Sequence, residues 1–186
     1  MIETERDPAV LAAIAVAFGH IGDERCVEPL VRLHPHPDAD VRMGVVFGLL
    51  KRPEPAALDA LITLSADSDA GVRDWATFGL ARQTTQDFPR LRAALAARLA
   101  DEDPDARAEA IHGLSVRGDA RALEPLLDAL RSPEPISDSF VITEALYALA
   151  AATGDPRLHQ YLIADREDHP DDEVPEALTA ALARYA

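Results

Sequence analysis

The sequence contains a single cysteine, Cys26, in 186 residues. One thiol cannot form an internal disulfide, so we expect packing to hold the fold together and the protein to reside in a reducing, cytoplasmic compartment. The first ten residues, MIETERDPAV, have neither the basic segment nor the apolar run of an export signal. No apolar run reaches the roughly eighteen residues that span a bilayer, so we expect a soluble protein with no membrane partner.

Basic residues are also scarce. The 18 Lys and Arg residues stand against 33 Asp and Glu residues, which gives a net charge of -15. Such a surface repels a phosphate backbone, so nucleic acid is not an expected partner. Hydrophobic residues make up 48% of the chain, enough for a sizeable core, and we expect one domain over residues 1–186.

What the sequence does have is an internal repeat of 31 to 35 residues. Each copy starts with an aspartate, which is followed by an aliphatic residue or alanine three positions later and by leucine eleven positions later. Glycine or alanine stands ten positions after each aspartate. The aspartates are Asp38, Asp69, Asp103, Asp138 and Asp171, and the glycines are Gly48, Gly79 and Gly113.

This spacing predicts a pair of helices in each copy. Offsets of three, seven, ten and eleven lie on one helix face, and an aspartate ahead of that face can cap the helix. Glycine inside a helix costs about 1 kcal/mol relative to alanine, so its recurrence indicates close approach of a second helix. Gly-Asp turns, as at Gly22-Asp23 and Gly118-Asp119, then lead to a second amphipathic helix such as CVEPLVRL.

The repeat resembles the HEAT-like repeats found in phycobilin lyases and in many bacterial proteins. The resemblance rests on the segments DADVR, DAGVR and DPDAR, which begin at Asp38, Asp69 and Asp103, and on GDERCVEPL and GDARALEPL. It covers nearly the whole chain. It implies an all-α fold, a right-handed α-solenoid of about five helix pairs with one extra helix at the C-terminus, and it leaves the function open because such repeats serve many partners.

No motif in the sequence indicates catalysis. His34, His36, Asp38 and Asp40 lie close together, but the two prolines between them do not direct the rings toward one point, so we interpret the segment as the elbow between two helices rather than a metal site. We expect Cys26 to be a small buried residue, because no histidine lies near it in sequence. No catalytic residue, metal ligand or cofactor is therefore expected, and we expect His112 to be a packed core ring.

Two further sets of residues have both a structural and a functional interpretation. Arg42, Arg73 and Arg107 recur four residues after the capping aspartates. They could form an anion-binding row, but the family resemblance favours a structural role, in which each bridges to a carboxylate of the neighbouring repeat. Trp75 occupies a position that Gly44, Glu109 and Glu144 fill in other copies. The position therefore tolerates charge, so we expect Trp75 to be partly exposed and a candidate partner contact.

The second helices provide the main candidate surface. We expect an outward ridge of small residues beside a charged flank, on the side that a solenoid of this kind makes concave. The ridge is Pro29, Ala60, Ala93, Pro125 and Gln160, and the flank is Glu28, Asp59, Arg92, Glu124 and His159.

These features predict a non-enzymatic scaffold or adaptor, monomeric or weakly self-associating, that binds a partner protein through a basic segment. Two alternatives remain open. One is a subunit of a phycobilin lyase or isomerase that handles a chromophore, and the other is an immunity or inhibitor protein.

Overall fold

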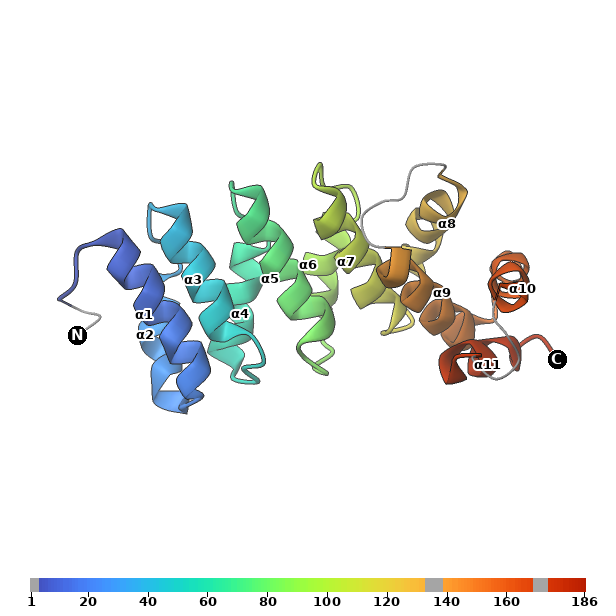
Figure 1. The fold of residues 1–186 in the computed structure, drawn as a ribbon, viewed down its shortest axis with the longest axis horizontal. Coiled ribbons are helices and arrows are strands. Elements are labelled where there is room, and N and C mark those ends of the chain that lie inside the picture. Colours follow the sequence, from blue (N-terminus) through green and yellow to red (C-terminus); the bar gives the residue numbers. More distant parts are fainter. Residues whose placement is uncertain (1–3, 133–138, 169–173) are drawn as a thin grey trace. The chain divides into compact units, whose positions relative to one another are not determined.

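The computed structural model describes residues 4–132, 139–168 and 174–186, and within these ranges the chain forms helices and no strand. The helices follow one another as five pairs and a final single helix (Figure 1). The all-α solenoid class, with five helix pairs and a C-terminal helix, is therefore confirmed. The pairs are α1 (Pro8–Ile21) with α2 (Val27–Leu33), α3 (Ala39–Leu49) with α4 (Pro55–Leu64), α5 (Ala70–Arg82) with α6 (Pro89–Arg98), α7 (Pro104–Ser115) with α8 (Leu123–Arg131), and α9 (Ser139–Thr153) with α10 (His159–Glu167), followed by α11 (Glu176–Leu182).

The repeated aspartates cap the first helix of each pair, as predicted. Asp38 and Asp103 each accept hydrogen bonds from two backbone N–H groups in the first turn of the following helix, and Asp69 accepts one from Val72. Asp7 does the same for α1. Asp138 and Asp171 lie outside the described residues.

The turn inside several pairs uses a Gly-Asp-x-Arg sequence. Gly22, Gly118 and Gly154 have positive φ angles between 61° and 76°, which glycine adopts without strain. The aspartate that follows each glycine accepts a hydrogen bond from the backbone N–H of the arginine two residues later. In the first and fourth pairs this turn continues as a short 3-10 helix, Glu24–Cys26 or Ala120–Ala122, so the second helix begins later than the sequence pattern predicts.

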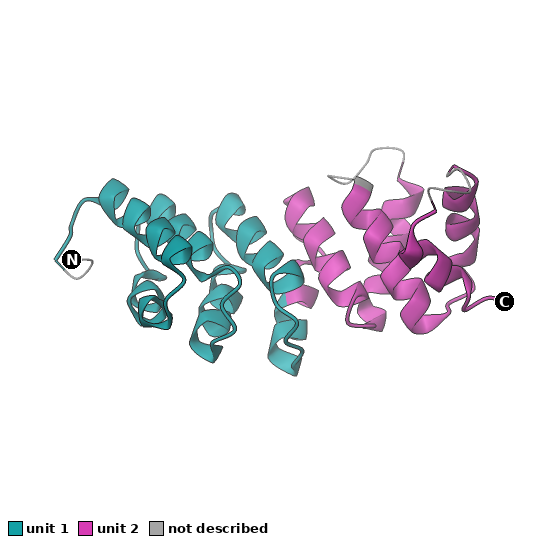
Figure 2. Cartoon of the chain, turned by 60° about the horizontal axis from the view of Figure 1, so that its bottom comes forward, with its two compact units in different colours: residues 1–94 teal, residues 95–186 magenta. Residues whose placement is uncertain are grey.

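The chain divides into two compact units, residues 1–94 and 95–186 (Figure 2). In the first unit α1 packs on α3 and α3 packs on α5, while α2 and α4 form a second row. In the second unit α9 packs between α7 and α11. The expectation of one domain over residues 1–186 stays a prediction.

The glycine column marks where helix backbones meet in the first unit. A Cβ atom on Gly48 would lie 2.6 Å from the carbonyl oxygen of Ala15, and one on Gly19 would lie 2.9 Å from Cα of Gly48. Close helix approach is therefore confirmed between α1 and α3. At Gly79 the neighbours are different, because an added Cβ would meet the side chain of Leu50 at 3.0 Å.

No helix in the described ranges combines the length and the apolar character that a bilayer crossing requires.

Candidate binding groove on the second helices

The His34 to Asp40 segment forms the elbow between α2 and α3. His34 Nδ1 lies 2.6 Å from the carbonyl oxygen of Val31, and His36 Nδ1 accepts a hydrogen bond from the backbone N–H of Asp38 at 3.1 Å. Asp67 and Asp101 accept the equivalent bond from Asp69 and Asp103 in later repeats. His36 thus replaces a structural carboxylate.

Within residues 4–132, 139–168 and 174–186, no group of three or more His, Cys, Asp or Glu residues could hold a metal ion.

The recurring arginines hold the turn that precedes their own helix. Arg42, Arg73 and Arg107 each donate from Nη1 to the two backbone carbonyls that lie six and five residues earlier. Sequence reasoning missed these bonds.

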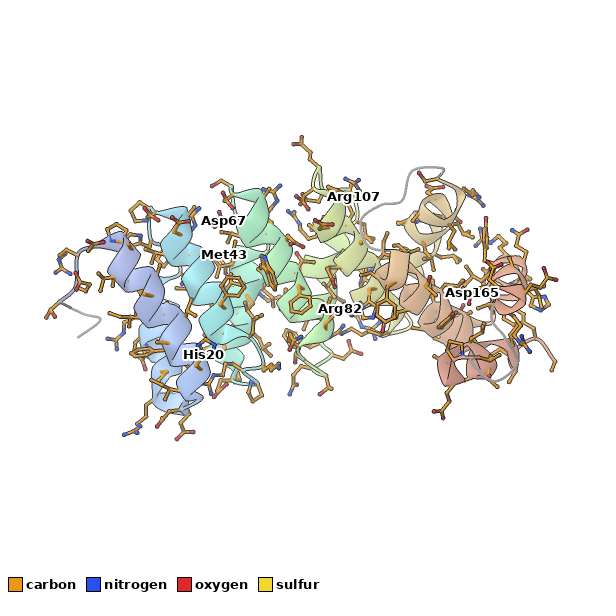
Figure 3. The ribbon with its side chains drawn as sticks, in the orientation of Figure 1. His20, Met43, Asp67, Arg82, Arg107 and Asp165 are labelled. Atoms are coloured by element: carbon orange, nitrogen blue, oxygen red, sulfur yellow. The ribbon has the colours of Figure 1, made fainter. Side chains whose placement is uncertain are left out.

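Arg42 also forms the predicted bridge to the next repeat. Its Nε and Nη2 donate to the two carboxylate oxygens of Asp67, both at 2.7 Å, and both side chains are largely buried. Figure 3 labels Asp67, in the loop ahead of α5. Burial raises the pKa of Asp67 while the hydrogen bonds from Arg42 lower it, and the net result lies below the ordinary value.

The three aromatic side chains of α3 and α5 cluster together. Trp75 is 39% exposed, which agrees with the expected partial exposure. Its ring packs edge-to-face against Phe47 and Phe78, at ring-centroid distances of 4.9 and 5.4 Å. Gly44, at the equivalent position of α3, is instead buried against the backbone of Ala12. Trp75 as a partner contact stays a prediction.

Cys26 and His112 are buried, as predicted. Cys26 is 8% exposed beside the core of the first unit. His112 is also 8% exposed, and its Nε2 lies 3.7 Å from a carboxylate oxygen of Glu144. Tyr147, in the same repeat column, is buried and donates its hydroxyl proton to Asp165, and burial together with this bond raises its pKa.

The predicted ridge on the second helices is partly wrong. Ala60 is 3% exposed and belongs to the core, whereas Ala93 is exposed. The second helices can be aligned on a buried leucine that each of them contains. In this alignment Ala93 and Gln160, rather than Arg92 and His159, occupy the position equivalent to Glu28, Asp59 and Glu124. These leucines are Leu30, Leu61, Leu95, Leu126 and Leu162, each at most 1% exposed.

Arg92 and His159 do not belong to the flank because the sequence pattern aligns α6 and α10 one residue away from the position that their buried leucines indicate. In the corrected register the flank position is acidic in three of five repeats, and the ridge position is occupied by residues that are buried or half-buried. They are Pro29, Ala60, Ala94, Pro125 and Tyr161.

Two of the predicted acidic residues form ion pairs with the following helix pair. Asp59 pairs with Arg90 at 2.6 Å within the first unit, and Glu124 pairs with Arg157 at 2.6 Å within the second. Both arginines stand five residues before a buried leucine. Each pair thus links a second helix to the next one along the chain or to the turn just ahead of it.

An open groove lies between α2 and α4. A hollow of about 710 Å³ lies there, with Val27, Val31 and Ala56 as its apolar surface. Glu24, Glu28 and Glu54 provide acidic groups around it, and Arg25 and Arg32 complete the lining. We call this the α2–α4 groove. It includes Glu28 from the predicted set, but sequence reasoning missed its other members.

The arginines of the α2–α4 groove are engaged with carboxylates of their own segment. Arg25 donates to both carboxylate oxygens of Asp23, which lowers the pKa of Asp23 to about 2. Arg32 pairs with Glu28 one turn earlier on α2, at 2.7 Å. Glu54 is in a different situation. Its Oε2 is buried and accepts no hydrogen bond from any described residue.

Comparison with known proteins identifies the repeat. The family model described as HEAT repeats matches residues 1–81, 63–139 and 92–183. The chain is 34% identical over 92 residues to Protein YibA of Escherichia coli, in strains K12 and O157:H7, a match that covers 50% of this chain and 32% of YibA. The chain therefore matches about a third of the length of these curated relatives.

Two solved structures share the fold. The X-ray structure of Escherichia coli YibA superposes with a TM-score of 0.77 at 25% identity and covers 99% of this chain and 64% of that one. The crystal structure of an engineered protein superposes with a TM-score of 0.66 at 23% identity, with 97% and 92% coverage.

Proposed function

Because the chain belongs to the HEAT-repeat family, we propose that it is a non-enzymatic binding module that holds a basic segment of a partner protein on its second-helix row. The α2–α4 groove carries this proposal. It combines an apolar surface, which can bury part of a partner, with carboxylates that select for positive charge.

The charge of the whole chain supports the same partner. A net charge of -15 attracts basic segments over distances of about 10 Å at ordinary salt and repels acidic ones. Asp59 and Glu124 already pair with an arginine of the following repeat, whereas the corresponding position opposite Glu28 is Ala56. We therefore place the partner's basic residues at α2 and α4.

Affinity capture from the native host, followed by quantitative mass spectrometry, tests the proposal. The baits are the unchanged protein, the double variant Glu24→Lys with Glu28→Lys, and the control Glu102→Lys with Asp168→Lys, whose substitutions lie at exposed sites outside the groove. Both variants change the net charge equally. A partner captured by the unchanged protein and the control, but lost from the groove variant, is the expected result.

The opposite pattern contradicts the proposal. If every captured protein stays bound to the groove variant, with its fold verified by circular dichroism, the partner does not use this face. The chromophore-handling and immunity alternatives stay predictions, since none of their distinguishing residues has been identified. An absorbance change on adding a bilin would favour the former.

A further inference from the structure

An arginine recurs at or just before the start of the second helices, and the repeat of α4 lacks it. Five residues before each buried leucine stands an arginine in four of the five repeats, while the repeat of α4 has Ala56. The four arginines are Arg25, Arg90, Arg121 and Arg157.

Where the preceding helix has a carboxylate at its flank position, this arginine binds it. Arg90 reaches back to Asp59 on α4, and Arg157 reaches back to Glu124 on α8. Glu28 on α2 is the equivalent of these two carboxylates, but the residue that should face it is Ala56. The methyl group of Ala56 leaves open the space that an arginine side chain fills elsewhere, and this space is part of the α2–α4 groove.

A second carboxylate lies in the same groove. Glu54 precedes α4 and makes no side-chain capping bond to it, and its buried Oε2 accepts no hydrogen bond from the described residues. A buried carboxylate oxygen without a donor is costly, and a donor from a partner would remove that cost. The groove thus presents carboxylates from two consecutive helix pairs around one vacant arginine position.

We infer that the α2–α4 groove binds an arginine side chain of the partner protein, which takes the place that Arg90 and Arg157 fill in the other repeats. Its guanidinium lies between Glu28 and Glu54, and its aliphatic stem packs on Val27 and Val31. This inference rests on the proposed function and specifies the partner's basic residue.

The geometry selects arginine over lysine. A guanidinium is planar and has five N–H donors, so it can bond two carboxylates on opposite sides, whereas an ammonium group is a compact point charge that holds its water more strongly. Glu28 already pairs with Arg32, but both side chains are more than half exposed, at 74% and 60%. Exposed pairs of this kind contribute little to stability, so Glu28 can exchange or share its partner.

Peptide titration followed by NMR tests the inference. The probes are the peptide acetyl-Gly-Leu-Arg-Leu-Gly-amide and its counterparts with lysine or with neutral citrulline in place of arginine. We expect the arginine peptide, at about 1–5 mM, to shift the signals of Val27, Val31 and Ala56. We expect it to bind about fivefold more tightly than the lysine peptide, and the citrulline peptide to bind least.

The variant Ala56→Arg supplies the missing arginine from the chain itself. It should pair with Glu28, keep the fold, and abolish the shifts caused by the arginine peptide. Ala97→Arg adds the same charge at another exposed alanine of a second helix and should leave binding unchanged. Equal binding of the arginine and lysine peptides, unaltered shifts in Ala56→Arg, or no shifts at all would each overturn the inference.

The two proposals can fail separately. If Glu24→Lys with Glu28→Lys loses a captured partner while the arginine peptide causes no shift, the second-helix row binds the partner without an arginine in this groove. If the peptide binds as expected but no captured partner depends on the groove, the arginine site stands and the assignment of the protein partner falls.

Discussion

At the scale of single residues, the glycine column contains two kinds of contact that the sequence cannot distinguish. Gly48 faces the carbonyl oxygen of Ala15, a backbone atom, whereas Gly79 faces the end of the Leu50 side chain. A backbone can move only with its whole helix, while a leucine side chain can change rotamer. The same sequence signal therefore has different energetic consequences at the two positions.

We predict that Gly48→Ala lowers the free energy of unfolding by about 1–3 kcal/mol, because the added methyl group forces α1 and α3 apart. Gly79→Ala should be close to neutral, since a small shift of Leu50 is offset by the higher helix propensity of alanine, about 1 kcal/mol. Urea unfolding of both variants measures this. Equal losses of unfolding free energy at Gly48 and Gly79 would show that the contact between α1 and α3 at Gly48 is no tighter than the contact between Gly79 and Leu50.

The Arg42–Asp67 pair gives a pH-dependent contribution to stability. The pKa of Asp67 is lowered in the folded state, so the pair stabilises the fold fully above the unfolded pKa of Asp, about 3.9, and this contribution is lost as pH falls through the lower folded pKa. We predict that Asp67→Asn costs about 1.5–3 kcal/mol at pH 7. The difference from the unchanged protein should shrink as the pH is lowered below about 4.

Urea unfolding at several pH values measures that difference. Asp59→Asn is the matched control, because Asp59 also pairs with an arginine but its side chain is 53% exposed. Its effect should be close to zero throughout. A cost for Asp67→Asn that is the same at pH 7 and in acid would rule out the carboxylate's charge as the source of the stabilisation.

At the scale of the helix, the sequence predicts most of the fold because caps, turns and apolar spacing agree. Asp38, Asp69 and Asp103 cap their helices as expected, and the five pairs with a final helix follow from the repeat. The register of α6 could not be predicted in the same way. Its sequence, PRLRAALAAR, is rich in alanine, which packs on either face of a helix, so periodicity alone leaves a one-residue ambiguity.

The candidate surface was predicted only in part, for two reasons. The ambiguity in α6 misplaced Arg92 on the flank, and the ridge position, one residue before the buried leucine, faces inward more than the pattern indicates. Glu28 was identified, but Ala60 was assigned to the surface although it is buried. The vacant arginine position at Ala56 becomes visible only when the second helices are aligned on their buried leucines. Glu54 could not be identified from the sequence, because its importance depends on a buried oxygen that has no donor in the described structure.

The leucine-based register predicts opposite outcomes for substitutions at two positions that the sequence pattern treats as equivalent. Ala60→Arg should place a guanidinium in the core and cost about 3 kcal/mol or more. Its melting temperature should fall by about 6–12 °C. Ala93→Arg should leave the melting temperature nearly unchanged, because Ala93 is exposed. Similar melting temperatures for the two variants would contradict the leucine-based register.

At the scale of the whole molecule, charge and repeat architecture together favour a binding function. The net charge of -15 speeds the approach of a basic partner, but it does not choose among the many carboxylates of the surface. Selection requires a place where carboxylates, an apolar surface and open space coincide. Within the described residues, the α2–α4 groove combines these three features in one repeat interval.

The most direct test of this account is carboxylate footprinting of the protein with a captured partner, read by mass spectrometry. A reagent that modifies exposed Asp and Glu side chains is applied to the free protein and to the complex. The account predicts that the partner reduces modification of Glu24 and Glu28 in the α2–α4 groove, while Asp40, exposed at the start of α3, reacts equally in both states. Protection of Asp40 with unchanged modification of Glu24 and Glu28 would place the partner on the first-helix row and contradict the account.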